Sequence, residues 1–257
     1  MIVESTLDRG IRTITLNRPP ANAINPDVIR ALRDAFDEAS ADWNTRVVVL
    51  QSANAKFFSA GWDVRQPPPN LDPAAFPPGV PRYSLHMARD VFRAIHQCAV
   101  PVIAKVRGIA VGAGFLYACL ADFAVASEKA MFGQFEVKIG AVGGAGILRR
   151  MMSEQAMRYL TWRAELVPVR ELTALGAGIR VVADEKLDEE VDTLAKLLAS
   201  REARVTRHAK YAFNQVEHMG ALEAYAVEQM HSLLLAGEDG RTQLQPDHAH
   251  HRGEEQR

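Results

Sequence analysis

The chain has 257 residues, 48% hydrophobic and 24% charged, the composition of a globular protein with one substantial core and a small appended region. Lys and Arg number 30 against 31 Asp and Glu, so the net charge of -1 argues against a partner that needs a large basic surface, such as nucleic acid. Cys98 and Cys119 stand in apolar surroundings without metal-ligand spacing. They predict buried free thiols, not a disulfide framework or a zinc site.

The N-terminal residues contain neither a basic region nor a long apolar run, and no stretch of 18 apolar residues occurs elsewhere. The last residues do not form a peroxisomal signal. We therefore expect a cytoplasmic protein that does not contact membranes.

The first predicted element is a β-branched strand at residues 11–16. Asn25 before Pro26 then predicts a helix N-cap, and apolar residues follow at helical spacing. Residues 47–50 and 100–106 are too apolar for exposed strands, so both are expected at the centre of a sheet. Helical patterns alternate with these strands at 25–43, 83–96, 113–119 and 146–162, which predicts an α/β fold.

Two later segments lack the apolar spacing of either a helix or a strand. Residues 66–82 hold seven of the 13 prolines, which predicts a loop that is either a lid over a pocket or a surface spacer. Near the C-terminus, His248, His250 and His251 lack partner ligands, so a disordered polar tail is favoured over a metal site. Between these segments, apolar residues at 222–234 form a stripe that we expect to be buried against another subunit.

Three short blocks carry the candidate chemistry. Phe58 to Asp63 and Gly108 to Gly114 are glycine-rich turns after apolar strands, which can point backbone N–H groups into a cleft. The third block, Phe132 to Glu136, adds one carboxylate. Two oriented donors and one base suggest chemistry through an enolate.

These blocks, together with Leu16-Asn17-Arg18-Pro19, resemble the crotonase superfamily of enoyl-CoA hydratases and isomerases in order and spacing. The resemblance continues to about Gly240. It implies an α/β fold in which repeated ββα units coil into a spiral, followed by a C-terminal helical region. We place the spiral core with its CoA-thioester site at residues 1–194, and the helical region with its tail at 195–257.

By the same resemblance, the backbone amides of Trp62 and Ala113 form an oxyanion hole and Glu136 is the general acid and base. A helix that begins at Ala113 would add its dipole to the stabilisation of an anion. Phe132 and Phe135 near Glu136 predict partial desolvation and a raised pKa of its carboxyl. Trp62 is larger than the residue usual at its position, so its indole is expected to narrow the acyl pocket.

Leu116 occupies the position where hydratases of this family carry a second glutamate. Leucine cannot hold or activate water, whereas one carboxylate suffices to move a proton from C2 to C4. An isomerase that shifts a double bond is therefore favoured. A hydratase or hydratase-lyase, with water held by other groups, stays open, as does a homologue that binds acyl-CoA or a partner without turnover.

The remaining candidate contacts to the substrate are weaker. Lys56 and Arg65 match positions whose cations approach CoA phosphates in relatives, although lone cations are often only solvated. Asp63 and Asp122 are expected to fix turns and helix ends. Glycines and small residues of the blocks complete the predicted substrate-binding set: Ala60, Gly61, Gly112 and Gly144.

No cofactor is expected, because coenzyme A is part of the substrate. Tyr117 and Arg149 replace the third glycine of a dinucleotide-binding fingerprint, which argues against a nicotinamide enzyme. Gly144 stands where the family's dehalogenases carry a nucleophilic aspartate. The expected partners are an acyl-CoA and further copies of the chain in a homotrimer or homohexamer.

Overall fold

The computed structural model describes residues 1–63 and 82–239, without the side chains of 82–86 and 238–239. The predicted Pro-rich lid, Arg65 and the histidine-rich tail lie outside this range. The chain divides into two compact units, Met1–Thr206 and Arg207–Arg257. The predicted boundary at 194/195 falls inside the helix α7, Leu187–Ala199, which belongs to the first unit.

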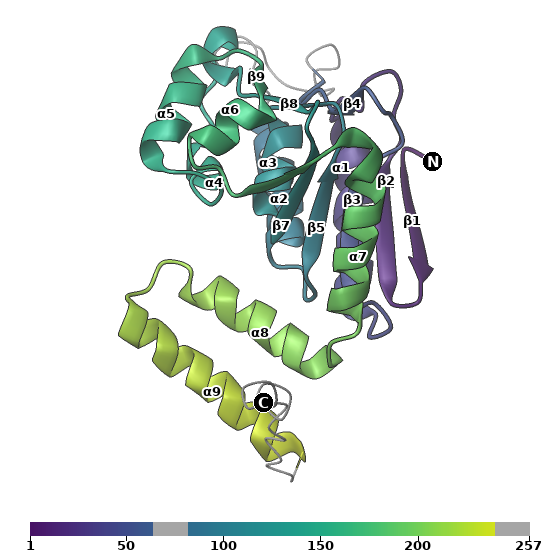
Figure 1. Cartoon of the computed structure of the whole chain (residues 1–257), viewed down its shortest axis with the longest axis vertical. Coiled ribbons are helices and arrows are strands. Elements are labelled where there is room, and N and C mark those ends of the chain that lie inside the picture. The colour runs from purple at the N-terminus through teal and green to yellow at the C-terminus, as the bar shows by residue number, and fades with distance from the viewer. Residues whose placement is uncertain (64–81, 240–257) are drawn as a thin grey trace, which may run out of the picture. The chain divides into compact units, whose positions relative to one another are not determined.

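Two sheets form the first unit, and successive pairs of strands contribute one strand to each (Figure 1). The larger sheet has the order β1-β2-β3-β5-β7-β10 and the smaller one β4-β6-β8-β9. The pairs are β3, Val47–Ser52, with β4, Phe57–Ser59; β5, Val102–Val106, with β6, Ile109–Val111; and β7, Phe123–Ser127, with β8, Met131–Gly133. This alternation agrees with the predicted spiral of repeated ββα units.

The paired strands are parallel within each sheet, which brings the ends of β4, β6 and β8 to one edge. Antiparallel strands occur only at the margins of the two described sheets. β1, Val3–Asp8, pairs with β2, Ile11–Leu16, and β9, Val167–Pro168, pairs with β8. β10, Ile179–Val182, lies parallel to β7. β2 begins and ends at the residues predicted for it, whereas β1 was not predicted.

Three helices begin within a residue of the predicted positions. α1, Pro26–Ala41, is capped by the Asn25 side chain, which accepts a hydrogen bond from the Val28 amide at 3.0 Å. α2 spans Arg82–His96, and α3 spans Ala113–Leu120. The N-cap prediction is confirmed, because the amide oxygen satisfies one of the free donors at the helix start.

The prediction of a single helix at 146–162 is wrong. The chain forms α4, Ala145–Leu148, and a separate α5, Glu154–Arg163. Ser153 starts the second helix by accepting a hydrogen bond from the Ala156 amide at 3.2 Å, while the turn before it buries Met151 and Met152. A serine with an acidic residue after it signals a helix start, and that local signal outweighs the continuous apolar spacing. Between β9 and β10 lies α6, Val169–Ala174.

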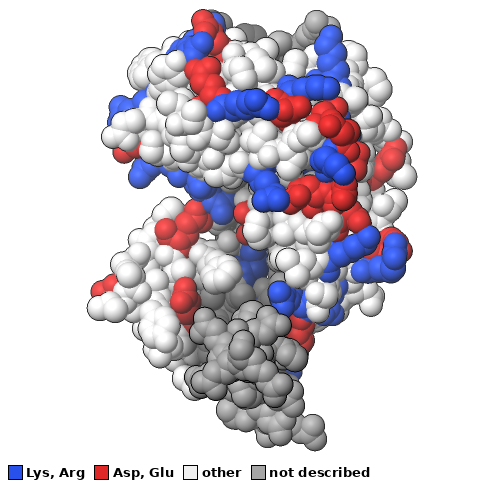
Figure 2. All heavy atoms as spheres, viewed as in Figure 1, with Lys and Arg blue, Asp and Glu red and all other residues white. Residues whose placement is uncertain are grey.

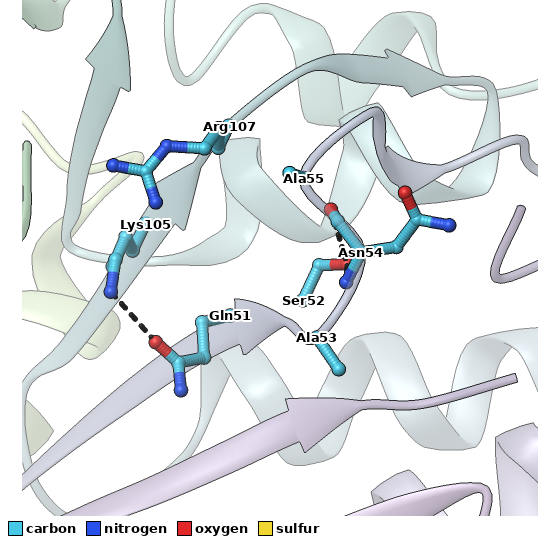
Figure 3. A pocket seen from close by; sticks show the side chains of 7 residues that line it. All are labelled: Gln51, Ser52, Ala53, Asn54, Ala55, Lys105 and Arg107. Atoms are coloured by element: carbon cyan, nitrogen blue, oxygen red, sulfur yellow. Dashed lines mark hydrogen bonds between the residues drawn. The ribbon is translucent and has the colours of Figure 1, made fainter. Parts of the chain in front are cut away.

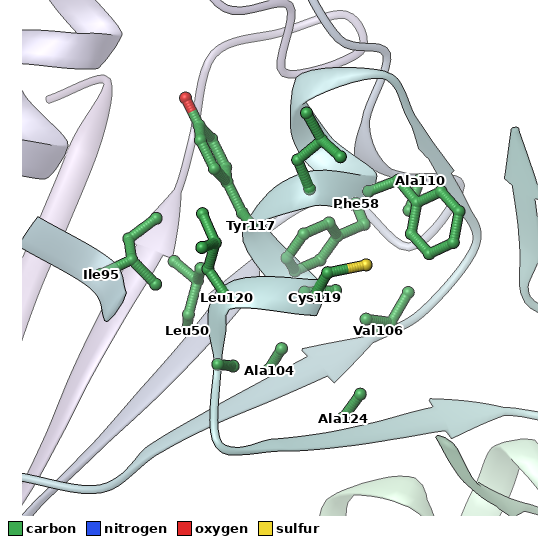
Figure 4. Close-up of a cluster of buried hydrophobic side chains, with 14 of the residues drawn as sticks. Leu50, Phe58, Ile95, Ala104, Val106, Ala110, Tyr117, Cys119, Leu120 and Ala124 are labelled. Atoms are coloured by element: carbon green, nitrogen blue, oxygen red, sulfur yellow. The ribbon is translucent and has the colours of Figure 1, made fainter. Parts of the chain in front are cut away.

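The larger sheet is covered on both faces, and β3 shows how. Val47 and Val49 pack with α7 residues such as Val191, while Val48 and Leu50 join the main core on the opposite face. This main core includes the buried sides of α1, α2 and α3. Figure 4 shows part of it, with Leu50 of β3, Phe58 of β4, Ile95 of α2, and Tyr117 and Cys119 of α3. Cys98 and Cys119 are buried and form no disulfide, as predicted.

The second unit contains most of α8, Ala203–Val216, and all of α9, Ala221–Asp239. The two helices meet at the imidazoles of His208 and His231, whose Nδ1 atoms lie 3.2 Å apart. The predicted apolar stripe on α9 is exposed in the single chain. The exposed fraction is 50–83% for Leu222, Met230, Leu233 and Leu234.

Candidate active site

The second glycine turn connects β6 to α3 at Gly112. Its φ of 50° is a left-handed value that favours glycine, and its amide donates to the Gly133 carbonyl of β8 at 3.0 Å. α3 begins at the next residue, Ala113. The amide of a first helical residue has no acceptor within its helix. The Ala113 N–H therefore lies at the positive end of α3, available to an external anion.

The first glycine turn presents the amide of Trp62. Ile24 and Trp62 form an isolated parallel bridge, in which the Ile24 amide donates to the Gly61 carbonyl at 2.7 Å and the Asp63 amide to the Ile24 carbonyl at 2.8 Å. In such a bridge the residue between the two bonded neighbours points its own N–H to the opposite side. The Trp62 amide thus faces away from Ile24.

The two turns touch backbone to backbone. Gly61 has a φ of 77°, and a Cβ atom at this position would lie 2.9 Å from the Val111 carbonyl oxygen and 3.6 Å from the Ala113 nitrogen. Any side chain here would push the turns apart. The glycine therefore lets the segment that carries the Trp62 amide approach the start of α3.

Glu136 lies against the second turn. It opens the 3-10 turn Glu136–Ile139 that follows β8, and it is half-buried. A Cβ atom on Gly112 would stand 3.0 Å from Glu136 Oε1 and 3.8 Å from the Gly61 Cα. The structure therefore places the predicted base beside the second glycine turn, which itself packs against the first, although these segments lie up to 75 residues apart in sequence.

The environment of Glu136 favours a carboxyl that exchanges protons. Burial raises its pKa above the ordinary value of 4.5, and hydrogen bonds from the backbone amides of Glu136 and Phe135 oppose this in part. Its Oε2 atom is buried and has no hydrogen-bond partner within the described residues. A desolvated carboxyl with a free oxygen suits a general acid and base.

Leu116 lies one turn into α3 and is 4% exposed. A Cβ atom on Gly144, whose φ is 85°, would lie 2.9 Å from Leu116 Cδ2 and 2.8 Å from Gln134 Nε2. An aspartate at residue 144 would therefore collide with both side chains. The position of the family's second glutamate is filled by packed hydrocarbon.

Trp62 is partly buried and packs against the main core. Ala60, also partly buried, donates its amide to the Ala21 carbonyl at 2.9 Å, which fixes the start of the same turn. Lys56 is exposed, and its Nζ lies 5.7 Å from the centroid of the Phe57 ring. Arg65 lies outside the described residues. The CoA-phosphate roles of both cations stay predictions.

The two aspartates fix local structure, as expected. Asp63 accepts a hydrogen bond from Arg18 at 2.7 Å, with both side chains largely buried. Asp122 accepts from the Val102 amide at 2.8 Å and so ties the end of α3 to the start of β5.

Two buried polar side chains near the site had no role in the sequence prediction. Gln134 is fully buried and donates from Nε2 to the Gly143 carbonyl at 3.2 Å. Tyr117, also fully buried, stacks edge-on against Phe92, and its hydroxyl has no partner within the described residues. The sequence block around Glu136 contains Gln134, but only the fold shows which groups its amide meets.

A small pocket lies at the ends of β3 and β5, apart from the residues named above (Figure 3). Its two cations are already engaged. Lys105 donates to Gln51 Oε1 at 2.9 Å and pairs with Asp188, while Arg107 pairs with Asp184 at 3.2 Å. The pocket of about 100 Å³ is too small for a CoA thioester.

The visible face of the molecule intersperses Lys and Arg with Asp and Glu (Figure 2). Within the described residues, no cluster of three or more His, Cys, Asp or Glu side chains can hold a metal ion. Across the same residues, no helix is both long and apolar enough to cross a bilayer.

Residues 6–243 match the sequence profile described as enoyl-CoA hydratase/isomerase. The chain belongs to this family, within the crotonase superfamily that the three blocks resemble. In solved structures, an enoyl-CoA hydratase from Mycobacterium smegmatis superposes with a TM-score of 0.84 at 28% identity, covering 92% of this chain and 91% of the other. The fold prediction is thereby confirmed.

Curated relatives are named for CoA-thioester reactions. Proteins of Rhodococcus jostii and Mycobacterium tuberculosis, each named (7aS)-7a-methyl-1,5-dioxo-2,3,5,6,7,7a-hexahydro-1H-indene-carboxyl-CoA hydrolase, are 35% and 36% identical to this chain. The matches cover 92% of this chain and 91% and 94% of the relatives. A carnitinyl-CoA dehydratase of Salmonella typhimurium is 32% identical over 86% of this chain and 83% of its own length.

Proposed function

We propose that the protein is an acyl-CoA enzyme in which Glu136 moves protons at the carbon next to the thioester, while the amides of Trp62 and Ala113 hold the thioester oxygen. The observation that carries the proposal is the contact of Glu136 Oε1 with Gly112, the residue just before Ala113. A base and an anion site this close act on adjacent atoms of one substrate. Each oriented donor is typically worth about 10²–10³ in rate.

The reaction we favour is isomerisation of an unsaturated acyl-CoA. Glu136 removes a proton from C2 of a 3-enoyl thioester, the amides stabilise the dienolate, and Glu136 returns the proton to C4. Leu116 supports this assignment, because its packed side chain supplies no second carboxylate for water. The cycle needs no other reactant.

A second candidate is hydrolysis of a ring-bearing acyl-CoA that carries ketone groups. It is supported by the similarity to the two hydrolases, whose printed name describes a fused bicycle with two oxo groups. Glu136 alone would have to activate the water, without the second carboxylate that Leu116 replaces, so this candidate ranks second. The products of this reaction would together weigh one water more than the substrate.

The proposal for Glu136 is tested by exchange of the C2 protons of a saturated acyl-CoA in heavy water. We expect the wild type to incorporate deuterium and Glu136→Gln to lose at least about 10² of that rate while it stays folded. Exchange at the wild-type rate in the variant would show that another group is the base.

We further propose that the protein works as a trimer or a dimer of trimers in the cytoplasm, without a cofactor. The exposed leucines of α9 support the assembly, because a lone chain would leave them in water. Sedimentation across micromolar concentrations checks this proposal, and a monomer throughout would contradict it.

A further inference from the structure

Ser59, the last residue of β4, is fully buried, and its hydroxyl makes two hydrogen bonds. Its Oγ donates to the Asn22 carbonyl at 2.8 Å and accepts from the Gly61 amide at 3.2 Å. Because a carbonyl only accepts and an amide N–H only donates, the direction of both bonds is fixed. The hydroxyl therefore ties the first glycine turn, at the residue before Trp62, to the segment that precedes α1.

The carbonyl that anchors Ser59 belongs to a residue that is itself held in place. Asn22 is 2% exposed and has a φ of 50°, a left-handed value that asparagine adopts more readily than most residues. Its Nδ2 donates to Ser52 Oγ at 2.7 Å and to the Phe58 carbonyl at 3.1 Å, and its Oδ1 accepts from the Arg18 amide at 2.8 Å. Backbone strain of this kind persists where the surrounding contacts fix the conformation. Ser59 is thus bonded to a carbonyl that cannot easily move.

Ser59 also packs against the helix that carries the second donor. Gly114 is the second residue of α3, and a Cβ atom on it would lie 2.5 Å from Ser59 Cβ and 2.8 Å from Ser59 Oγ. Glycine destabilises a helix relative to alanine. The close approach of Ser59 explains why a glycine is needed here. The start of α3 therefore lies directly on the Ser59 side chain.

These two contacts of Ser59 lie next to the two proposed donors. Gly61 precedes Trp62, and Gly114 follows Ala113. A donor is effective only when it lies about 2.7–3.1 Å from the atom on which negative charge develops. The separation of the two amides must therefore be held within a fraction of an ångström. One buried side chain in contact with both turns is suited to hold it.

We propose that Ser59 is a positioning residue that sets the separation between the amides of Trp62 and Ala113, and so determines how strongly the site polarises the thioester carbonyl. The inference rests on the proposed function, because it assumes that these amides bind the thioester oxygen. Ser59 is fully buried and acts through the backbone of the two turns, without touching the substrate.

Two variants disturb this arrangement from opposite sides. Ser59→Ala keeps the Cβ atom that packs against Gly114 but removes the hydroxyl, so the buried Gly61 amide loses its acceptor and the first turn is free to shift. Gly114→Ala keeps the hydroxyl but places a methyl group 2.5 Å from Ser59 Cβ, which pushes the start of α3 away. Both variants should therefore misalign the two donors.

Ser52→Ala is the matched control. The Ser52 hydroxyl also makes hydrogen bonds on both sides, because it donates to the Phe57 carbonyl at 2.7 Å and accepts from Asn22 Nδ2 at 2.7 Å. Its remaining partner is the backbone of Asn54. These partners are not neighbours of Trp62 or Ala113 in the chain. Loss of this hydroxyl should lower stability without misaligning the donors.

The experiment measures the infrared stretching frequency of a ¹³C-labelled thioester carbonyl in a bound saturated acyl-CoA, and the rate of C2 deuterium exchange in heavy water. Hydrogen bonds to the carbonyl oxygen lower this frequency, whereas a loss of stability alone leaves it unchanged in folded protein. We expect Ser59→Ala and Gly114→Ala to reduce the frequency shift and to lower kcat of exchange at least about tenfold, with KM within about threefold of wild type. Ser52→Ala should keep the shift and stay within about twofold in kcat. Thermal melting shows which variants are folded.

Three results would overturn these assignments. A full frequency shift and wild-type exchange in Ser59→Ala would overturn the inference and leave the proposed function intact. Equal losses in Ser59→Ala and Ser52→Ala would also overturn it, because Ser59 would then only support the fold. Wild-type protein that neither shifts the carbonyl frequency nor exchanges C2 protons would overturn the proposed function itself.

Discussion

Glu136 and Gly112 are in contact, so that a methyl group on Gly112 would stand 3.0 Å from Glu136 Oε1. The contact joins the segment after β8 to the turn before α3. Gly112 is the residue before Ala113, whose amide is the proposed donor. We therefore expect this glycine to matter for the position of Glu136 as well as for its own φ of 50°.

Gly112→Ala should therefore lower the rate of C2 proton exchange by at least about tenfold, because displacing the carboxylate by a fraction of an ångström spoils its alignment. Gly140→Ala is the matched control. Gly140 also has a positive φ, 75°, but a Cβ atom there would meet nothing within 4 Å. Both variants carry backbone strain of about 1–3 kcal/mol, which denaturant unfolding measures as a lower free energy of unfolding. Equal activity loss in both would mean that strain, not Glu136, is responsible.

The raised pKa of Glu136 predicts how activity and stability depend on pH. Since the base must be ionised, exchange should fall on the acid side with a midpoint above 4.5. The folded state binds this proton more tightly than the unfolded state, so Glu136 lowers the free energy of unfolding as the pH rises through its folded pKa. Glu136→Gln should hence have a higher melting temperature than the wild type at neutral pH, and this difference should disappear below pH 4.5. An acid midpoint below 4.5 would contradict the desolvated site.

Leu116→Glu should increase hydration of a 2-enoyl thioester, because it adds the carboxylate that hydratases of the family carry. The gain is expected to be small, since a glutamate in this packed pocket lacks supporting hydrogen bonds. Leu116→Gln is the control of equal size without a base. Water addition that rises equally in both variants would show that pocket shape, not the carboxylate, limits it.

Trp62→Ala should broaden the range of acyl groups accepted while the backbone donor is kept. The indole packs against the core, so some loss of stability is expected from the cavity. Specificity constants across a series of chain lengths and branched acyl groups provide the measurement. An unchanged ranking of substrates would place the indole away from the acyl group.

The sequence predicted the elements whose signals are local. Asn25 marks a helix start by its own chemistry, and the apolar run at residues 47–50 marks a central strand. The break at Ser153 was missed because apolar spacing continues across it. β1 was missed as well, since half of its residues are exposed at the edge of the sheet.

For the site, the order of the three blocks was enough to predict that Glu136 comes close to the glycine turns. The buried position of Gln134 was not predictable, because it depends on contacts with Gly143, Gly144 and Leu116 that only the folded chain creates.

We propose that one carboxylate, Glu136, moves a proton on an acyl-CoA and that no second carboxylate activates water. The decisive measurement offers the protein matched 3-enoyl and 2-enoyl thioesters and identifies the products by mass and by NMR. We expect the wild type to convert the 3-enoyl thioester to a product of unchanged mass much faster than it adds water to the 2-enoyl thioester. Glu136→Gln should abolish this conversion. Addition of water to the 2-enoyl thioester as fast as isomerisation of the 3-enoyl one would contradict the proposal.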